Sequence, residues 1–293
     1  MGRVAFLTSA DMLADHPRRR TDHWELDREY GPMRAACAER GVDLELVVWD
    51  DASVDPSAFD AAVIGTTWDY AERPESFLAR LEALEAAIPL FNPTRVVRWN
   101  LDKRYLADLE RRGAPIVPTQ FAERADDATI AAAFDRLEAD ELVVKPLVGA
   151  SAWRQVRVRA GEPLPPPDER PPDRALIQPF LPAVATEGEY SFVAFGRELS
   201  HAVRKVPARG DYRVQSMYGA REEVHHPDAA ERALVTRVLE AVEEPLLYAR
   251  LDLVRGLDDA LCVMELELVE PYLYPEQGPD MGALFAAELA RRL

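Results

Sequence analysis

The chain has 293 residues, of which 48% are hydrophobic, so it is long enough for two packed domains or one large one. It carries 35 Lys and Arg residues against 52 Asp and Glu residues, a net charge of −17. A protein this acidic repels nucleic-acid phosphate and anionic membranes, so we expect neither nucleic acid nor a membrane as a partner.

The first part of the chain alternates strands and helices. Strands are expected at 3–9, 43–49 and 61–67, and helices at 24–40 and 74–87. This order predicts a small parallel sheet with helices on its faces. Ligands of such sheets bind at the carboxyl ends of the strands, where the sequence places the loops LTSAD and GTTWDY.

The remainder of the chain mixes helices with strands that are joined by short turns. Helices are expected from about Leu101 to Arg112, at 127–138, at 228–242 and from near Pro279 to the end. Strands are expected at 115–120, 141–146, 175–180, 189–195, 198–206, 246–254 and 261–270. The proline-rich tract 161–173 is predicted to be a loop. Because the later strands follow one another through hairpins, this part should be α+β and antiparallel.

Cys37 and Cys262 each lie in an apolar-periodic segment and are expected to be reduced core residues. No apolar stretch has the length of a signal peptide or a membrane span, so a cytoplasmic location is expected.

The segment VMELELVEP carries an acidic stripe. Glu265 and Glu267 are two residues apart on a strand, so their side chains share one face. Asp252 lies on the preceding strand, and a hairpin would bring all three carboxylates together. Such oxygen ligands suit magnesium, which would also neutralise their mutual repulsion. From the residues alone, a solvated outer face of the hairpin is an equally open alternative.

Several basic residues stand out in so acidic a chain. Lys145 ends an apolar strand and precedes the small residues Gly149 to Ala152, whose backbone N–H groups could approach phosphate. Lys103 lies in a helix, and four more basic residues fall within 204–213. Taken singly, each of these features is more often ordinary surface than a binding site.

The order of the motifs is more specific than any one of them. The series NLDK, VVKP, LIQPFL, GEYSFVAF, RKVPARGDYR, ARLDLV and MELELVEP resembles the ATP-grasp ligases, in particular glutathione synthetase and D-alanine–D-alanine ligase. Within that superfamily, TTWDY, EGEYSF, SHAVRKV and ELELVEP look closest to the group that forms D-cycloserine from O-ureido-serine. The resemblance covers about residues 60 to 293.

The resemblance implies an ATP-grasp fold with α/β and α+β parts. An N-terminal parallel-sheet domain would cover 1–92, and an ATP-grasp domain 93–293, with subdomains at about 93–178 and 179–293 that clamp ATP. ATP and Mg²⁺ are the implied cofactors, and a small amino-acid-like molecule is the implied substrate. A homodimer is expected by analogy with the family.

The resemblance also implies roles for individual residues. Lys103 and Lys145, with Gly149 and Ser151 of the small loop, would bind the phosphates. The adenine would be read by the linker residues Gln178, Pro179, Phe180 and Leu181, and the ribose by Glu189. Asp252, Glu265 and Glu267 would bind metal, and Arg250, Arg213 and Lys205 would be the catalytic basic residues. Substrate would contact Thr67, Trp68, Asp69, Tyr70 and Glu270.

Three departures from the family pattern bear on this assignment. Glu267 stands where the third metal ligand is usually asparagine. The phosphate loop has a single glycine, which puts its closure over ATP in doubt. Glu270 replaces a small, neutral turn and would attract an amine.

The expected reaction activates a carboxylate as acyl-phosphate for a nitrogen nucleophile, with intramolecular cyclisation favoured. An intermolecular amino-acid or peptide ligase and a non-catalytic nucleotide-binding regulator are the alternatives.

Overall fold

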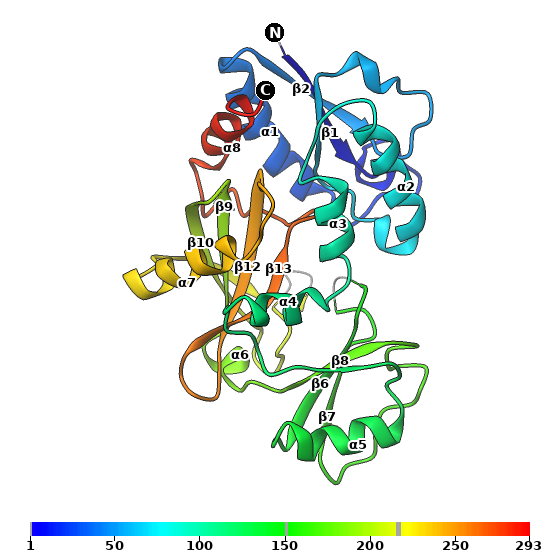
Figure 1. The fold of residues 1–293 in the computed structure, drawn as a ribbon, viewed down its shortest axis with the longest axis vertical. Coiled ribbons are helices and arrows are strands. Elements are labelled where there is room, and N and C mark those ends of the chain that lie inside the picture. The colour runs from blue at the N-terminus through cyan, green and yellow to red at the C-terminus, as the bar shows by residue number, and fades with distance from the viewer. Residues whose placement is uncertain (1, 150–151, 215–217) are drawn as a thin grey trace.

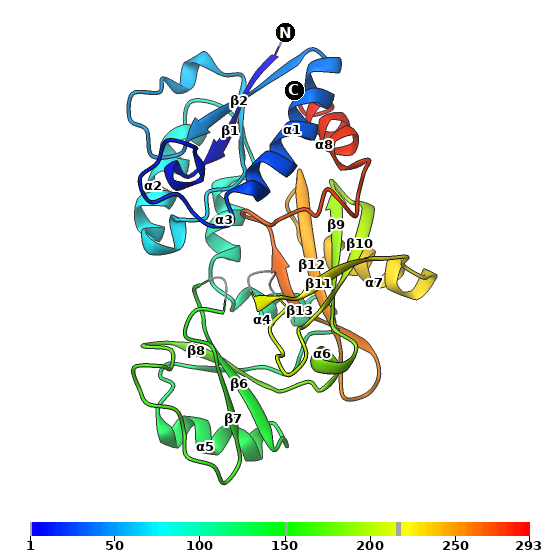
Figure 2. The ribbon, with the colours of Figure 1, turned by 180° about the vertical axis from the view of Figure 1, so that it is seen from behind.

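The computed structural model describes residues 2–149, 152–214 and 218–293, which form three layers along the long axis of the molecule (Figure 1). Each layer contains one β-sheet, of four, five and four strands. The N-terminal sheet lies at one end, the five-stranded sheet in the middle and the small sheet at the other end (Figure 2). The predicted combination of a parallel α/β layer with antiparallel α+β layers is confirmed.

The N-terminal sheet is parallel, with the order β2-β1-β3-β4. Its strands are β1 (Gly2–Thr8), β2 (Val42–Val48), β3 (Ala61–Ile64) and β4 (Leu90–Phe91). Three 3-10 turns occur in its loops: η1 (Ala10–Met12), η2 (Pro56–Ala58) and η3 (Tyr70–Glu72). Successive residues of β1 enter different cores, because side chains alternate along a strand. Phe6 belongs to the core beside α1 (Trp24–Glu39), and Leu7 to the core beside α2 (Pro74–Glu85).

The last helix of the chain returns to this first layer. Helix α8 (Met281–Ala290) lies beside α1, and both chain ends are at this end of the molecule (Figure 1). A glycine permits the close approach: a Cβ added to Gly282 would lie 2.6 Å from the Pro32 carbonyl oxygen. The C-terminal segment therefore contributes to the N-terminal layer, and the expected division of the chain at residue 92 stays a prediction.

The central sheet is antiparallel and is covered on both faces. Its order is β11-β10-β9-β12-β13. The strands are β9 (Glu189–Phe195), β10 (Glu198–Val206), β11 (Arg221–His225), β12 (Tyr248–Arg255) and β13 (Leu261–Glu267). On one face, Phe192 packs with residues of α4 (Tyr105–Arg111) and α7 (Ala229–Glu240). On the other, Phe195 packs with the N-terminal layer and α8. The sheet is thus held between two hydrophobic cores.

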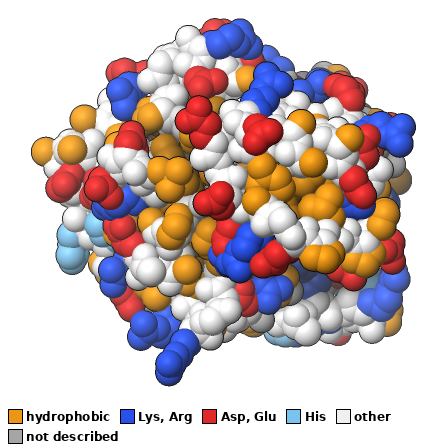
Figure 3. All heavy atoms as spheres, turned by 90° about the horizontal axis from the view of Figure 1, so that it is seen from below, with side chains coloured by type: hydrophobic (Ala, Val, Ile, Leu, Met, Phe, Trp, Pro, Cys, Tyr) orange, Lys and Arg blue, Asp and Glu red, His pale blue; other side chains and the backbone are white. Residues whose placement is uncertain are grey.

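The small sheet forms the third layer, with the order β5-β8-β6-β7. Its strands are β5 (Gln120–Ala122), β6 (Glu141–Pro146), β7 (Val156–Arg159) and β8 (Ala175–Pro179). Helix α5 (Asp127–Arg136) packs on it and is capped by Asp126, whose carboxylate accepts from the Thr129 N–H at 2.9 Å. The short helices α3 (Thr94–Asn100) and α6 (Ala183–Thr186) lie in the connections. Seen from this end of the molecule, acidic and basic side chains are interspersed on the surface (Figure 3).

Several expectations from the sequence are wrong. The helix expected from Leu101 to Arg112 is shorter and is α4, and helix α3 before it was not predicted. The strand expected at 115–120 is reduced to a bridge between Ile116 and Val263 before β5. Strands β7 and β11 were not predicted. Helix α3 contains two valines and a tryptophan, which have weak helix propensity, and β11 is a polar edge strand.

The structure confirms Cys37 and Cys262 as free, buried residues. In the ranges that the structure describes, no helix has the length and apolar character needed to cross a membrane.

Candidate active site

The three carboxylates predicted to bind metal come together on the hairpin of β12 and β13. Asp252 lies directly opposite Glu265, and Arg250 directly opposite Glu267. The ligand oxygens of Asp252, Glu265 and Glu267 all lie within 4.8 Å of one another. Asp252 is only 2% exposed, so the alternative of a solvated outer face is wrong. Three hard oxygen donors on a rigid hairpin fit magnesium.

Positive side chains of the protein itself balance these acids. Arg250 donates from Nε to Asp252 Oδ1 at 3.1 Å and from Nη2 to Asp252 Oδ2 at 3.0 Å, and it also pairs with Glu267. Lys103 Nζ lies 2.9 Å from Glu265 Oε1. Lys205 pairs with Glu189 and lies 3.5 Å from Asp252 Oδ2. The acidic stripe is therefore tolerated without metal, which the sequence did not reveal.

The protonation of the triad follows from this environment. Burial disfavours the charge on Asp252, but Arg250 and Lys205 outweigh it and lower the pKa to about 2. Burial likewise opposes ionisation of Glu265, and Lys103 and Lys145 nevertheless hold its pKa below the ordinary value. For Glu267 burial prevails over Arg250 and raises the pKa to about 7. A divalent cation at this position would favour the ionised form of Glu267.

A cleft of about 750 Å³ runs past the triad, and side chains from all three layers line it. The predicted nucleotide-binding residues that line it are Lys103, Lys145, Gly149, Gln178, Pro179, Phe180, Leu181 and Glu189. The predicted catalytic residues Lys205, Arg213 and Arg250 line it as well. Ser151 lies outside the described residues. The structure thus brings the phosphate, adenine and metal candidates to one cavity, while their individual roles stay predictions.

The two lysines lie beside the phosphate loop. Lys103 Nζ donates to the Gly149 carbonyl oxygen at 2.8 Å in addition to its ion pair with Glu265. Lys145 extends from the end of β6 into the same cleft, and burial lowers its pKa. Lys145 is partly buried, and its role in binding phosphate stays a prediction.

The linker segment is held by the small sheet. Gln178 is 3% exposed and donates from Nε2 to Thr119 Oγ1 at 2.9 Å. The Phe180 N–H donates to the Glu141 carbonyl oxygen at 2.8 Å. Within the described chain, no backbone carbonyl accepts from the Leu181 N–H. A free N–H at the cleft wall is compatible with the predicted reading of adenine.

Arg213 lines the cleft from the connection between β10 and β11. Its Nη2 lies 2.7 Å from Asp211 Oδ2, and its guanidinium stacks 3.7 Å from the centre of the Tyr218 ring. The adjacent Tyr212 meets Phe180 of the linker edge to face, with ring centres 5.7 Å apart. The connection that carries Arg213 thus touches the segment predicted to hold adenine.

The loop TTWDY contributes to the cleft only in part. Trp68 and Tyr70 line it, and the Trp68 indole donates to the Glu270 carbonyl oxygen at 2.9 Å. Tyr70 is 8% exposed and also belongs to the core beside α2, so it packs in the core as well as lining the cleft. Glu270 lines the cleft, and burial, then the neighbouring Glu267, raises its pKa to about 8.

The expectations for Asp69 and Thr67 are wrong. Asp69 does not line the cleft: its Oδ1 accepts from the Trp49 indole at 2.7 Å and its Oδ2 pairs with Arg73. Thr67 is fully buried and also lies outside the lining. Neither side chain is placed to touch a substrate, because the loop turns both inward to the N-terminal layer.

Sequence reasoning missed many residues of the cleft, among them Glu25, Glu222, Tyr272 and Tyr274. A signal was available for Glu25. Glu25, Glu29 and Met33 follow one another at four-residue spacing, so two acids lie on the face of α1 that faces the core. Buried acids at apolar positions point to a function or a structural contact. For Glu222, on a strand that was itself missed, the sequence carries no such signal.

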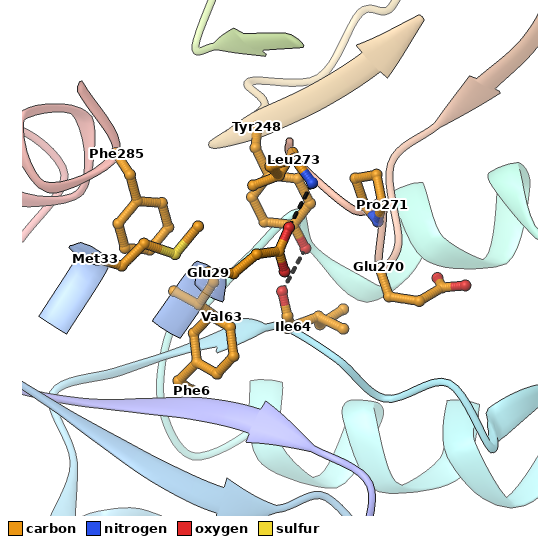
Figure 4. A pocket seen from close by; sticks show the side chains of 11 residues that line it. Phe6, Glu29, Met33, Val63, Ile64, Tyr248, Glu270, Pro271, Leu273 and Phe285 are labelled. Carbon is orange, nitrogen blue, oxygen red and sulfur yellow. Dashed lines mark hydrogen bonds between the residues drawn. The ribbon is translucent and has the colours of Figure 1, made fainter. Parts of the chain in front are cut away.

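Glu29 has a structural contact. It is 3% exposed and accepts from the Leu273 N–H, which fixes the segment after β13 against α1 (Figure 4). A cavity of about 10 Å³ adjoins it, and the Glu270 side chain points away from Glu29. Burial raises the pKa of Glu29 to about 8.

We expect Glu29→Gln to flatten the dependence of stability on pH. Folded Glu29 holds its proton more tightly than the unfolded chain does, so its contribution is fully present below about pH 4.5 and is lost as pH rises to about 8. Glutamine keeps an acceptor for Leu273 and cannot ionise. The free energy of unfolding, measured in urea at pH 5 and at pH 9, should fall between these two pH values in wild type. In the variant this fall should be about 2–4 kcal/mol smaller. Glu39→Gln, exposed on the same helix, should keep the wild-type profile, and an unchanged profile in Glu29→Gln would refute the explanation.

Comparison with known proteins gives three findings. Residues 4–92 match the family described as D-cycloserine synthetase DcsG, N-terminal domain. The whole chain is 35% identical to the cycloserine biosynthesis protein DcsG of Streptomyces lavendulae, covering 99% of that protein. The crystal structure of D-cycloserine synthetase DcsG superposes with a TM-score of 0.83 at 32% identity, over 99% of both chains.

A more distant structural likeness is to the D-alanine–D-alanine ligase of Bacillus anthracis. Its TM-score is 0.68 at 16% identity, over 100% of this chain and 98% of that one. At this identity the comparison shows that the fold is shared.

Proposed function

Since the chain belongs to the family of the D-cycloserine synthetase DcsG, a group of ATP-grasp ligases, we propose that it cyclises an amino-acid derivative of the O-ureido-serine type. ATP-dependent joining of a carboxylate to an amine is the activity of such ligases. In this proposal the carboxylate and the nitrogen belong to one small molecule. ATP and Mg²⁺ would occupy the cleft. A homodimer stays an expectation from the family.

The observation that supports this reading most strongly is the convergence at β12 and β13. Asp252, Glu265 and Glu267 offer oxygen ligands, and Lys103, Lys205 and Arg250 already lie against them. A magnesium ion bound there would neutralise phosphate charge during phosphoryl transfer. The cations now paired with the acids would then be released to bind phosphate oxygens. This exchange would give both the carboxylates and the basic residues a function: the carboxylates would bind magnesium, and the basic residues would bind phosphate.

The residues around the triad would have different roles in the reaction. Lys103 and Lys145 would orient the phosphates, and the 178–181 linker would hold adenine. The substrate carboxylate would accept phosphate and become an acyl-phosphate. Arg250 would stabilise the oxyanion formed when the nitrogen attacks, because its guanidinium is already fixed by the Tyr272 carbonyl oxygen at 3.1 Å.

ADP release separates this proposal from its alternatives. With MgATP and each stereoisomer of O-ureido-serine as sole amino acid, we expect ADP and a product derived from one substrate molecule, identified by mass spectrometry. ADP release only with pairs of amino acids would establish an intermolecular ligase instead. No ADP with any single amino acid or pair would favour a nucleotide-binding regulator.

A further inference from the structure

Two acidic side chains line the cleft without an assigned role. Glu25 lies in the first turn of α1, and Glu222 lies on β11, the edge strand of the central sheet. They are almost 200 residues apart in sequence, yet the negative charge of Glu222 raises the pKa of Glu25. One comes from the N-terminal layer and the other from the central layer, so a ligand between them would bridge the two.

Neither carboxylate has a partner among the described residues. Glu25 is 8% exposed, faces the cleft and makes no side-chain hydrogen bond or ion pair within the described ranges, and the same holds for the half-buried Glu222. Burial, followed by the charges of Asp22 and Glu222, raises the pKa of Glu25 to about 8. An unpaired buried carboxylate is unfavourable, so this position favours a bound cation.

The nearby arginines are engaged elsewhere. Arg20 donates from Nε and Nη2 to the two carboxylate oxygens of Asp22, each at 2.8 Å. Arg28 lies 2.6 Å from Glu276. The protein therefore pairs these arginines with Asp22 and Glu276. The charges of Arg250 and Lys205 act on Glu25 and Glu222 respectively, but among the described residues no cation forms an ion pair with either carboxylate.

Tyr272 connects these acids to the reacting end of the cleft. Its carbonyl oxygen accepts from Arg250, while its ring meets Trp24 edge to face with ring centres 6.3 Å apart. Trp24 directly precedes Glu25 in α1. A single residue thus links the arginine of the metal site to the helix that carries Glu25. A small zwitterion could place its carboxylate toward Arg250 and a positive group toward Glu25.

Resting on the function proposed above, we infer that Glu25 and Glu222 bind the ammonium group of an amino-acid substrate. The cation is a primary ammonium and not a second metal ion, because the described residues provide the three clustered acidic ligands of a metal only at Asp252, Glu265 and Glu267. Trp68 and Tyr272 line the same region and supply aromatic surface for the carbon chain beside the charge.

The test compares two substrates that differ only in the amino group. O-ureido-serine is assayed beside 3-(ureidooxy)propanoate, which lacks the α-amine, with wild type, Glu25→Gln and Glu222→Gln. Asp27→Asn on α1 and Glu223→Gln on β11 are the matched controls: Asp27 is exposed, and Glu223 is paired with Arg204. Each variant is checked by thermal unfolding, and if one fails to fold the other still tests the site.

Wild type should prefer the amine-bearing substrate in kcat/KM by about ten- to a hundredfold, as expected of hydrogen bonds to a charged group. This preference should collapse in Glu25→Gln, weaken in Glu222→Gln and persist in both controls. An unchanged preference in the two variants, or an equal loss with both substrates, would overturn the assignment.

A failure of the cyclisation proposal is separable from a failure of this one. If wild type releases no ADP with O-ureido-serine, calorimetry with a non-hydrolysable ATP analogue measures the binding of free amino acids against their N-acetyl forms. A preference for the free amine that Glu25→Gln abolishes supports the ammonium site. Absence of binding of every free amino acid, or a preference that survives in both variants, refutes it.

Discussion

Replacing Glu265 by glutamine is expected to reduce ATP-dependent turnover by at least about a hundredfold, the scale of losing one group that stabilises transition-state charge. Glu265 is a member of the carboxylate triad and the partner of Lys103 at 2.9 Å. Glutamine keeps the volume but supplies no charge for a metal ion. ADP release under saturating MgATP and substrate measures the effect.

The fold of the Glu265→Gln variant should survive. Lys103 retains its hydrogen bond to the Gly149 carbonyl oxygen, and Lys145, which loses the charge of Glu265, still has the charges of Glu189 and Asp252 near it. Asp259→Asn is the matched control, because Asp259 is exposed in the turn that joins the same two strands. Turnover near the wild-type level in Glu265→Gln, with the fold intact, would show that the triad does not hold the catalytic metal.

Arg250→Met is expected to lose both turnover and stability. Arg250 is 7% exposed and contacts Asp252, Glu267 and the Tyr272 carbonyl oxygen. Removing it leaves the buried Asp252 and the half-buried Glu267 with less compensation, and breaking a buried ion pair typically costs about 3–5 kcal/mol. Thermal and urea unfolding should therefore show a large loss in the absence of ligands, together with loss of ADP release.

The same variant also tests whether magnesium replaces the basic side chains as the partner of the carboxylates. Because magnesium would neutralise the carboxylates that Arg250 leaves behind, MgATP should restore more stability to Arg250→Met than to wild type. Arg255→Met, at the end of the same strand and paired with the partly exposed Glu187, should cost about 1 kcal/mol or less. Wild-type stability in Arg250→Met without ligand would contradict the account of the charge balance.

Periodicity was sufficient to predict most of the strands that build the site. The apolar pattern of LVVK, YSFVAF and VMELEL reveals β6, β9 and β13, because each strand carries buried apolar residues and is flanked by turn residues. It failed where local preference and tertiary structure disagree. Helix α3 carries β-branched residues, and β11 is stabilised by pairing with β10 rather than by an apolar pattern of its own.

The site was predictable to the extent that its residues lie on one hairpin. The pairing of β12 with β13 follows from a short turn, and it brings Asp252 opposite Glu265. The partners of the acids were not predictable, since Lys103 reaches Glu265 from a segment 162 positions earlier. Asp69 was misassigned for a similar reason. The sequence indicates the loop, but it does not indicate that the Asp69 carboxylate accepts hydrogen bonds from Trp49 and Arg73.

The central claim is that Asp252, Glu265 and Glu267 form a magnesium site that is loaded together with ATP. Calorimetric titration of the wild-type protein with ATP, once in magnesium and once in EDTA, tests it most directly. Bringing a triphosphate beside three carboxylates without a metal is unfavourable, so ATP should bind at least about tenfold more weakly in EDTA. Equal affinity in magnesium and in EDTA would contradict the assignment of the triad.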